Sequence, residues 1–390
     1  MTAIPPPWTR LTGTAHAIAL EVLLRGPLPR SELARRLGLS AASVTRLAKP
    51  LLDSGLLIEE GPSQQSRTGR PTRPLDIAPS SHHFIGVKVT GEDAHAVLTT
   101  LRAEVIASCR SDLRGKDPEA VVATVAGLVA ELASGAPHVT ALGLSLGGQV
   151  PDHRTVVAAP FLEWTEDIAL GALLEEATGL PTVVENDLLA LTRAEHWFGA
   201  ARDHDRFAVL TTGVSVGYGL VVHGAVVDSP DAGVGLVGHF PLDPLGPMCP
   251  EGHRGCASAM LSMPSVCASV SVGLQRPVTY EECLDLAAEG HPVAEPVITA
   301  SARALGRLVA AVANLTMTPL VILTGEGIRL AEVARPALDE ALRRDRNPRA
   351  APLSLEVQAV DFAQWARGAA ATAVQDYVLS GAAEEGTAAD

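Results

Sequence analysis

From residue 84 onward the chain alternates short apolar runs with longer helical stretches, and this alternation limits the fold more than any other feature of the sequence. The apolar runs lie at 84–87, 139–144, 181–184, 207–210 and 321–323. Stretches rich in alanine and leucine lie between several of them, as at 118–133 and 297–316. Buried strands that alternate with helices predict an α/β body. With 390 residues, 47% of them hydrophobic, we expect two or three domains and a large core.

The first 78 residues differ from the rest of the chain in charge. They contain ten basic side chains against six acidic ones, whereas the whole chain has a net charge of −14. A basic head on an acidic body is typical of a DNA-binding protein with a separate sensor, and only the head can dock onto DNA. Aromatic residues make up only 3% of the chain, which argues against a single-strand binder that stacks bases.

The sequence also indicates a cellular compartment. It has no run of 18 apolar residues, and three prolines at 5–7 stand where a signal peptide needs an apolar segment. Five cysteines are an odd number, and only Cys249 and Cys256 lie close together, which argues against a disulfide framework. We therefore expect a cytoplasmic protein with no membrane partner.

The head has the pattern of a helix-turn-helix. Apolar residues at 15, 18, 19, 22 and 23 predict a first helix, 31–37 a second, and Ser40 is a good N-cap for a third. The third helix places Val44, Leu47 and Leu51 inward, and we expect Pro50 to kink it or end it early. Its outward side chains have the chemistry to read a major groove, and the expected DNA-binding residues are Ala42, Ser43, Thr45, Arg46 and Lys49.

Two apolar runs at 56–59 and 75–77 follow and predict a two-stranded wing. Its tip carries Arg67 and Arg70 beside Gly69, which can reach phosphates or a narrow minor groove. The alternative is a basic solvated surface on a helical domain that never touches DNA. Three helices, a wing and the local charge agree in favouring DNA.

Several motifs stand in order along the body and resemble those of the ROK family, which comprises repressors, open reading frames and sugar kinases. They are 143–150 (GLSLGGQV), 160–164 (PFLEW), 184–187 (VEND), 215–219 (SVGYG), 235–239 (GLVGH), 249–256 (CPEGHRGC), 314–319 (NLTMTP), 323–327 (LTGEG) and 367–370 (RGAA). The resemblance runs from about 84 to 373. It implies an actin-like, two-lobed sugar-kinase fold with a ligand cleft, preceded by the winged helix of the repressor branch. The expected domains are a winged helix-turn-helix at 1–78, a sensor at 79–380 and a disordered tail at 381–390.

The body departs from the resemblance at its phosphate loop. A ROK kinase has an Asp-x-Gly-Gly-Thr turn whose acid serves the magnesium-phosphate centre. Here Lys88 stands at the position of that Asp, and Glu92 adds negative charge. We therefore expect no ATP or magnesium and no enzyme activity. A second loop at 212–219 keeps several glycines, which serve equally well in tight turns.

The resemblance also names a ligand site. Asp187 matches the general base of the family, and the expected ligand-binding residues are Asn186, Asp187 and His239. Two of the glutamates with which the family grips a sugar are replaced, by Leu236 and Ser258. Their loss weakens the binding of an ordinary hexose, so we expect an effector that is a sugar, a sugar derivative or a less polar compound, or no effector.

The zinc loop of the family is altered as well. His239, Cys249 and Cys256 keep the spacing, while Glu251 replaces the middle cysteine. Zinc accepts a carboxylate or an imidazole, so Glu251 or His253 can complete a structural site. The alternative is a lost metal and two free thiols.

These observations together predict a DNA-binding transcriptional regulator, a repressor in the first instance, with a non-catalytic kinase-like effector domain. We expect a homodimer or homotetramer on an inverted-repeat operator of double-stranded DNA. Two alternatives stay open: an active sugar kinase with a DNA-binding head, and a regulator whose body senses no ligand and serves only for dimerisation.

Overall fold

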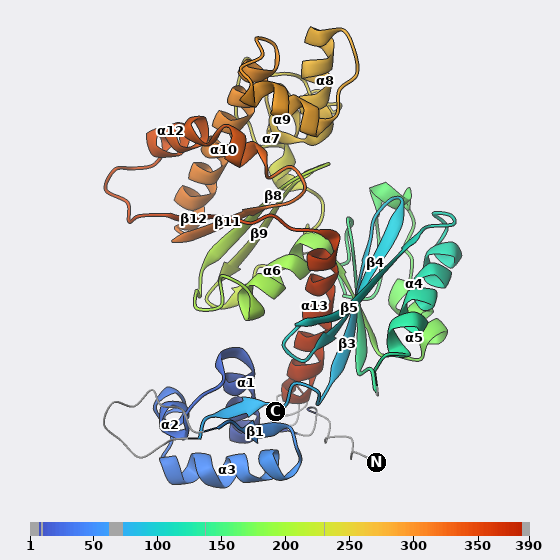
Figure 1. Ribbon diagram of the computed structural model, residues 1–390, viewed down its shortest axis with the longest axis vertical. Helices are drawn as coiled ribbons and strands as arrows, with labels where there is room; N and C mark the ends of the chain where they lie inside the picture. The colour runs from blue at the N-terminus through green and yellow to red at the C-terminus, as the bar shows by residue number, and fades with distance from the viewer. Residues whose placement is uncertain (1–7, 9–10, 62–72, 137, 230, 384–390) are drawn as a thin grey trace.

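The computed structural model describes residues 8, 11–61, 73–136, 138–229 and 231–383. Figure 1 shows three parts: a small helical head at one end, a first lobe built on one sheet, and a second lobe built on another at the far end. The long helix α13 (Phe362–Ala383) runs from the junction of the two lobes to the head. The predicted α/β body with a winged-helix head is confirmed.

The head contains the three predicted helices and the wing. Its elements are α1 (Gly13–Arg25), α2 (Arg30–Leu37), α3 (Ala41–Asp53), β1 (Leu57–Glu59) and β2 (Leu75–Ile77). Gly38 ends α2 in the left-handed conformation at φ 64°, which glycine adopts without steric cost. The Ser40 hydroxyl then accepts a hydrogen bond from the backbone N–H of Ser43 and caps α3. The two strands pair antiparallel, with Leu57 opposite Ile77.

The prediction that Pro50 ends α3 early was wrong. The helix continues to Asp53, and the backbone N–H of Ser54 still donates to the carbonyl of Pro50. Pro50 lies in the last turn of α3, so little helix follows it. The buried side chains of Ala48 and Leu51 hold this turn against the core of the head. Tertiary packing there outweighs the local cost of the proline.

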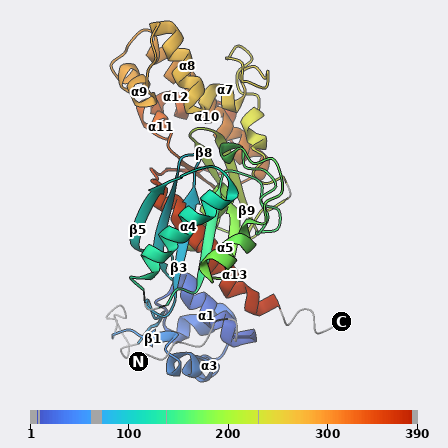
Figure 2. The same ribbon diagram turned by 90° about the vertical axis from the view of Figure 1, so that its right-hand side faces the viewer.

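The first lobe has a five-stranded sheet in the order β5-β4-β3-β6-β7. β3, β6 and β7 are parallel to one another, whereas β4 and β5 are antiparallel additions at one edge. The strands are β3 (His83–Val89), β4 (Asp93–Thr100), β5 (Val105–Asp112), β6 (Ala141–Leu146) and β7 (Thr182–Asn186). α4 (Pro118–Ala133) and α5 (Leu170–Thr178) cover one face and α13 covers the other (Figures 1 and 2).

The second lobe repeats this plan with the strand order β10-β9-β8-β11-β12. Its strands are β8 (Phe207–Thr212), β9 (Val216–Val222), β10 (Ala225–Val226), β11 (Leu320–Thr324) and β12 (Ser354–Val357). Its helices are α7 (Ala257–Leu261), α8 (Met263–Leu274), α9 (Tyr280–Ala288), α10 (Ala294–Thr316), α11 (Leu330–Val333) and α12 (Arg335–Asp345). By length and composition α10 could cross a membrane, but most of its apolar window is buried in the core of this lobe, as in a core helix of a globular protein.

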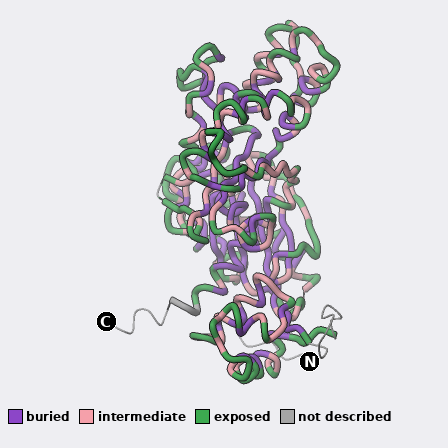
Figure 3. The backbone as a smooth tube through the Cα atoms, turned by 90° about the vertical axis from the view of Figure 1, so that its left-hand side faces the viewer, coloured by how far each residue is buried: buried purple, intermediate pink, exposed green. Residues whose placement is uncertain are grey.

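Two helices fill the space between the lobes, α6 (Asp187–Phe198) and α13. α13 packs very closely on the first sheet: a methyl group on Gly86 would come within 2.1 Å of the carbonyl oxygen of Ala366, and one on Gly143 within 1.9 Å of that of Ala369. Only glycine permits this approach. Buried residues accordingly gather along the middle of the molecule, at the sheets and α13 (Figure 3).

The head is docked onto the body rather than tethered to it. One continuous hydrophobic core contains Trp8, residues of all three head helices, Phe84 of β3 and Val378 of α13. Arg102, in the turn between β4 and β5, donates hydrogen bonds to the carbonyls of Val22 and Leu23 and to Asp76. α13 continues to Ala383, three residues into the segment expected to form a tail, and 384–390 lie outside the described residues.

Candidate DNA-binding surface, ligand cleft and metal centre

The outward face of α3 carries the expected DNA-reading side chains. Ala42, Thr45, Arg46 and Lys49 are exposed, and Ser43 is half-buried against the N-cap. Val44, Ala48 and Leu51 on the opposite face are buried. The helix therefore separates an apolar inner face from a polar outer face, as a helix that enters a groove requires.

The outward face of α3 differs from the rest of the described head because its basic side chains are not paired with acids. Arg30, Arg35 and Arg36 pair with glutamates of the head: Glu59, Glu32 and Glu21. Among the described residues, Arg46 and Lys49 form no ion pair. Unpaired cations can neutralise phosphates or bind guanine, and in the described part of the head they lie on α3. Arg67 and Arg70 lie outside the described residues.

Asp187, one of the expected ligand-binding residues, forms an ion pair that the sequence pattern did not indicate. Lys88, near the end of β3, donates a charge-assisted hydrogen bond to Asp187, the first residue of α6. The side chain of Lys88 is 8% exposed and that of Asp187 is 21% exposed. The Lys88 ammonium also lies 5.4 Å from the ring centroid of Trp365 in α13, a cation–π arrangement. The residue at the family's phosphate position thus binds the residue at its general-base position.

Asn186 is engaged by the protein itself. Its side-chain oxygen accepts hydrogen bonds from the backbone N–H groups of Leu188 (3.0 Å) and Leu189 (3.2 Å) and caps α6. Its amide nitrogen donates to the carbonyl of Gly148 at 2.9 Å. The side chain therefore fixes the start of α6, and with it the position of Asp187.

Segments of both lobes lie close to Asn186 and Asp187. Gly233 of the second lobe lies against the first, since a methyl group there would come within 2.1 Å of the carbonyl oxygen of Gly148. The short η3 helix (Leu236–His239) follows directly, and the Leu236 side chain is 68% exposed. From the first lobe, Phe161 projects beside Gly147 and is 43% exposed.

The second glycine loop is crowded by an acid. A methyl group on Gly213 would come within 2.3 Å of the Oε2 atom of Glu326, in the turn after β11. The backbone N–H of Gly327 donates to the carbonyl of Thr212 and holds the two turns together. A carboxylate so close to the loop repels a phosphate.

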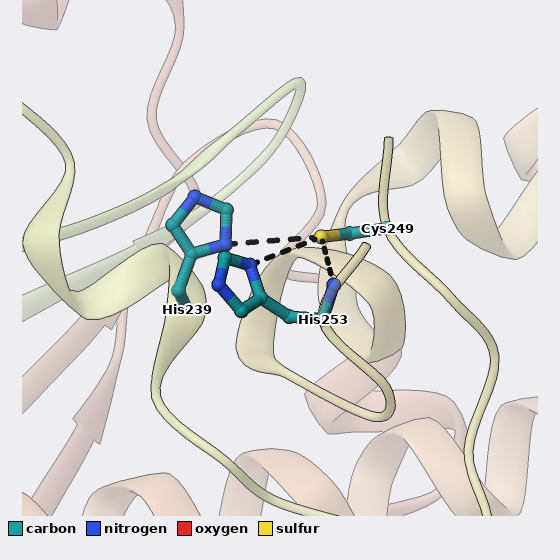
Figure 4. Close-up of side chains that lie close together, drawn as sticks. All are labelled: His239, Cys249 and His253. Atoms are coloured by element: carbon teal, nitrogen blue, oxygen red, sulfur yellow. Dashed lines mark hydrogen bonds between the residues drawn. The ribbon is translucent and has the colours of Figure 1, made fainter. Parts of the chain in front are cut away.

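Three of the predicted metal ligands meet in the second lobe (Figure 4). The Cys249 sulfur lies 3.9 Å from His239 Nδ1 and 3.6 Å from His253 Nδ1, and all three ligand atoms lie within 4.8 Å of one another. Zinc–sulfur and zinc–nitrogen bonds at a tetrahedral angle place two such ligands about 3.6 Å apart. The donor set and its spacing therefore fit zinc.

The other two candidates lie beside this cluster. Cys256 is buried and packs with Cys249. Burial raises the pKa of the Cys256 thiol, and the neighbouring Cys249 raises it further. The backbone N–H of Ala259, which donates to this sulfur, opposes the shift. Glu251 is exposed, and a hydrogen bond with Cys249 lowers its pKa. The cluster of His239, Cys249, His253 and Cys256 is consistent with the structural zinc site of the family. In the described residues no hydrogen bond or ion pair joins His239 to Asp187.

A further polar cluster lies where the lobes meet. His153 Nδ1 is 3.3 Å from Glu185 and His153 Nε2 is 3.6 Å from Asp228, and Arg193 pairs with both carboxylates. Although an imidazole and two carboxylates suit a metal, the Arg193 guanidinium already occupies the place of a cation. Of the four residues, sequence reasoning reached only Glu185, as part of a motif, because the others are far apart in the chain.

A model of the ROK family matches residues 84–375. The chain belongs to the ROK family. A model of the MarR family matches residues 11–67, which contain the helix-turn-helix. A MarR-like head before a ROK body is the architecture of the ROK transcriptional repressors, and the predicted family and fold are confirmed.

Three similar proteins illustrate the relationship. The chain is 24% identical over 371 residues to the DNA-binding transcriptional repressor Mlc of Escherichia coli K12, with 91% of each chain covered. A solved ROK family transcriptional regulator, a homologue of the E. coli MLC protein, has a TM-score of 0.79 at 25% identity and covers 94% of this chain and 96% of its own. A ROK family glucokinase from Streptomyces griseus, solved with glucose and AMPPNP, has a TM-score of 0.63 at 25% identity and covers 75% of this chain and 99% of its own.

Proposed function

We propose that this protein is a cytoplasmic transcriptional repressor whose kinase-like body is a non-catalytic effector domain. The observation that carries the proposal is the ion pair between Lys88 and Asp187. It distinguishes a regulator from a kinase that happens to have a DNA-binding head, since both have the same fold.

The ion pair opposes phosphoryl transfer in two ways. A general base must accept a proton from the attacking hydroxyl, but an oxygen of Asp187 is occupied by the Lys88 ammonium. The acid that would serve a magnesium-phosphate centre is absent, because Lys88 occupies its position. Glu326 beside Gly213 adds a negative charge where phosphates would approach.

The DNA target is an inverted repeat whose two major-groove half-sites are bound by two heads of a homodimer or homotetramer. α3 enters the groove, with Arg46 able to form two hydrogen bonds to guanine and Lys49 able to reach phosphate. Arg67 and Arg70 belong to the proposed wing contacts with A·T-rich flanks. The effector binds beside Asn186 and Asp187 and is a sugar, a sugar derivative or a less polar compound.

The metal is one structural zinc per chain, held by His239, Cys249, His253 and Cys256. His253 is favoured over Glu251 by the turn that contains them. The backbone N–H of Cys249 donates to the carbonyl of His253, and the N–H of His253 donates to the sulfur of Cys249, so these two residues lie together while Glu251 is exposed. Bound there, the metal would pin the loop that follows η3.

Two measurements test the proposal on the purified full-length chain. Selection of bound genomic fragments at moderate salt should enrich inverted repeats over random DNA. A coupled assay of ADP release should show no magnesium-dependent phosphorylation of glucose, N-acetylglucosamine or xylose above a no-enzyme control. The kinase alternative is correct instead if a sugar stimulates ADP release and Asp187→Ala abolishes that release.

A further inference from the structure

We infer that helix α13 couples the ligand cleft to the DNA-binding head, with Trp365 as its contact at the cleft and Tyr377 as its contact at the head. The inference rests on the proposed regulator function and names how that function is regulated. Figure 1 shows α13 running from between the lobes to the head, and Figure 2 shows its far end beside α1.

The cleft end of α13 lies directly against the ion pair. Trp365 is 6% exposed, its ring lies under the Lys88 ammonium, and Lys88 binds Asp187. The indole N–H of Trp365 is buried without a hydrogen-bond partner among the described residues. Any ligand group that draws Asp187 away from Lys88 therefore changes the surroundings of Trp365 at once.

The middle of α13 has no clearance in which to absorb a movement. The side chains that face the first sheet are short and buried, as at Ala366, Ala369, Ala370 and Ala373. Backbone touches backbone at Gly86 and Gly143. Close-packed interiors transmit displacement rather than dissipate it. Twelve residues separate the two contacts, which corresponds to about 18 Å along a helix axis.

The head end of α13 holds the head by specific hydrogen bonds. The Tyr377 hydroxyl accepts from the backbone N–H of Trp8 at 2.9 Å and lies 3.0 Å from His82 Nε2. The carbonyl of Val378 accepts from His16 Nε2 at 2.8 Å, and His16 belongs to α1. Burial lowers the pKa of His82 to about 4, so His82 stays uncharged near neutral pH.

A second connection runs beside the first. Arg367, two residues after Trp365, donates to the carbonyl of Ala103 at 2.8 Å and to that of Phe198 at 3.0 Å. The adjacent Arg102 holds the last turn of α1 and Asp76 of the wing. A shift of α13 thus reaches both α1 and the wing. A ligand shifts a conformational equilibrium only through contacts that differ between the two states of the protein. In this inference those contacts belong to the two routes along α13.

Hydrogen–deuterium exchange of the full chain tests the inference without a known effector. Lys88→Met imitates loss of the ion pair, and Lys116→Met is the matched control, since Lys116 forms an exposed pair with Glu163 in the same lobe. We expect Lys88→Met to change exchange in α1 and at 374–383 by roughly 2- to 30-fold, and Lys116→Met to leave both unchanged. Trp365→Phe, which keeps an aromatic ring, serves as the second cleft variant if Lys88→Met fails to fold.

A double-mutant cycle separates transmission from general loosening. Tyr377→Phe removes only the hydroxyl that joins Trp8 and His82. If α13 couples the sites, Lys88→Met has a smaller effect on α1 in the Tyr377→Phe background than in the wild type, because only the Val378 and Arg367 contacts remain to transmit it. Changes confined to β3 and α6, or effects that simply add, would overturn the inference. The exchange measurement needs no DNA, so its failure is distinct from a failure of the protein to bind an operator.

Discussion

Substitution of Arg46 should reduce the discrimination of the protein between operator and scrambled DNA. Its side chain is exposed at the middle of α3 and free of ion pairs within the described residues. A bidentate contact of arginine with guanine discriminates by about 1–3 kcal/mol, which is roughly 5- to 150-fold in affinity. A symmetric dimer would make this contact in both half-sites. Arg46→Ala should therefore reduce the ratio of operator affinity to scrambled-DNA affinity by the square of this factor.

Two further variants of the head make the prediction specific. Lys49→Ala should weaken binding to all sequences and reduce the slope of log K against log salt by about 2, since a dimer loses two phosphate contacts worth about 0.9 each. Arg35→Ala is the matched control: Arg35 is exposed in the same head but engaged by Glu32, whose pKa this pairing lowers to about 2.

Fluorescence anisotropy on a labelled selected fragment and a scrambled one, at several salt concentrations, measures both quantities. We expect Arg35→Ala to retain the specificity ratio and most of the salt slope. If Arg35→Ala weakens operator binding as much as Arg46→Ala does, or if Lys49→Ala leaves the salt slope intact, the outward face of α3 is not the DNA-binding surface.

Three further predictions concern the body. Chelator-washed protein should retain about one zinc per chain by elemental analysis; His253→Ala should lose it and Glu251→Gln should keep it, and the opposite pattern would make Glu251 the ligand. Arg102→Ala should cost about 3–5 kcal/mol in chemical denaturation, because Asp76 is left buried without its partner, whereas Arg110→Ala on the exposed face of β5 should cost far less. The pKa of His153 is raised by the neighbouring Glu185 carboxylate, against the effect of burial. The stability that this pairing contributes is therefore complete below about pH 6.5 and is lost as pH rises through the higher folded pKa. His153→Gln should flatten this dependence, and a variant whose pH profile of stability matches the wild type would refute the prediction.

The fold was largely predictable because its signals are local and periodic. The apolar run at 84–87 lies within β3, and the helical stretch predicted at 118–133 is α4 with the same bounds. The two wing strands begin and end within one residue of their predicted bounds. Pro50 failed as a helix terminator because packing from distant residues decides the last turn of α3. Local propensity carries no information about such packing.

The candidate sites were predictable only where a motif brings residues together in the chain. The loop 249–256 holds Cys249, His253 and Cys256, so its cluster was foreseeable, although the choice between Glu251 and His253 was not. The turn favours His253, because Gly252 adopts φ 86° and returns the chain so that His253 lies opposite Cys249. Trp365 carries no signal of its own in the sequence, and the motif that contains Glu326 does not show that its carboxylate lies beside Gly213.

The pairing of Lys88 with Asp187 explains how one substitution can change the use of a kinase fold. These residues are 99 positions apart, on β3 and α6, and the family register assigns one to the phosphate side of the reaction and the other to the base. In a catalytic body, charge at both positions must stay available for the transition state. Here the two charges are satisfied by each other in the free protein. A buried charge left without its partner costs free energy, so thermal motion rarely separates Lys88 from Asp187. A ligand that supplies new partners for one or both groups can still open this ion pair. In the sensor that we propose, the binding energy of a ligand would move Lys88, Trp365 and α6, so that an exchange of partners unsuited to catalysis would serve sensing.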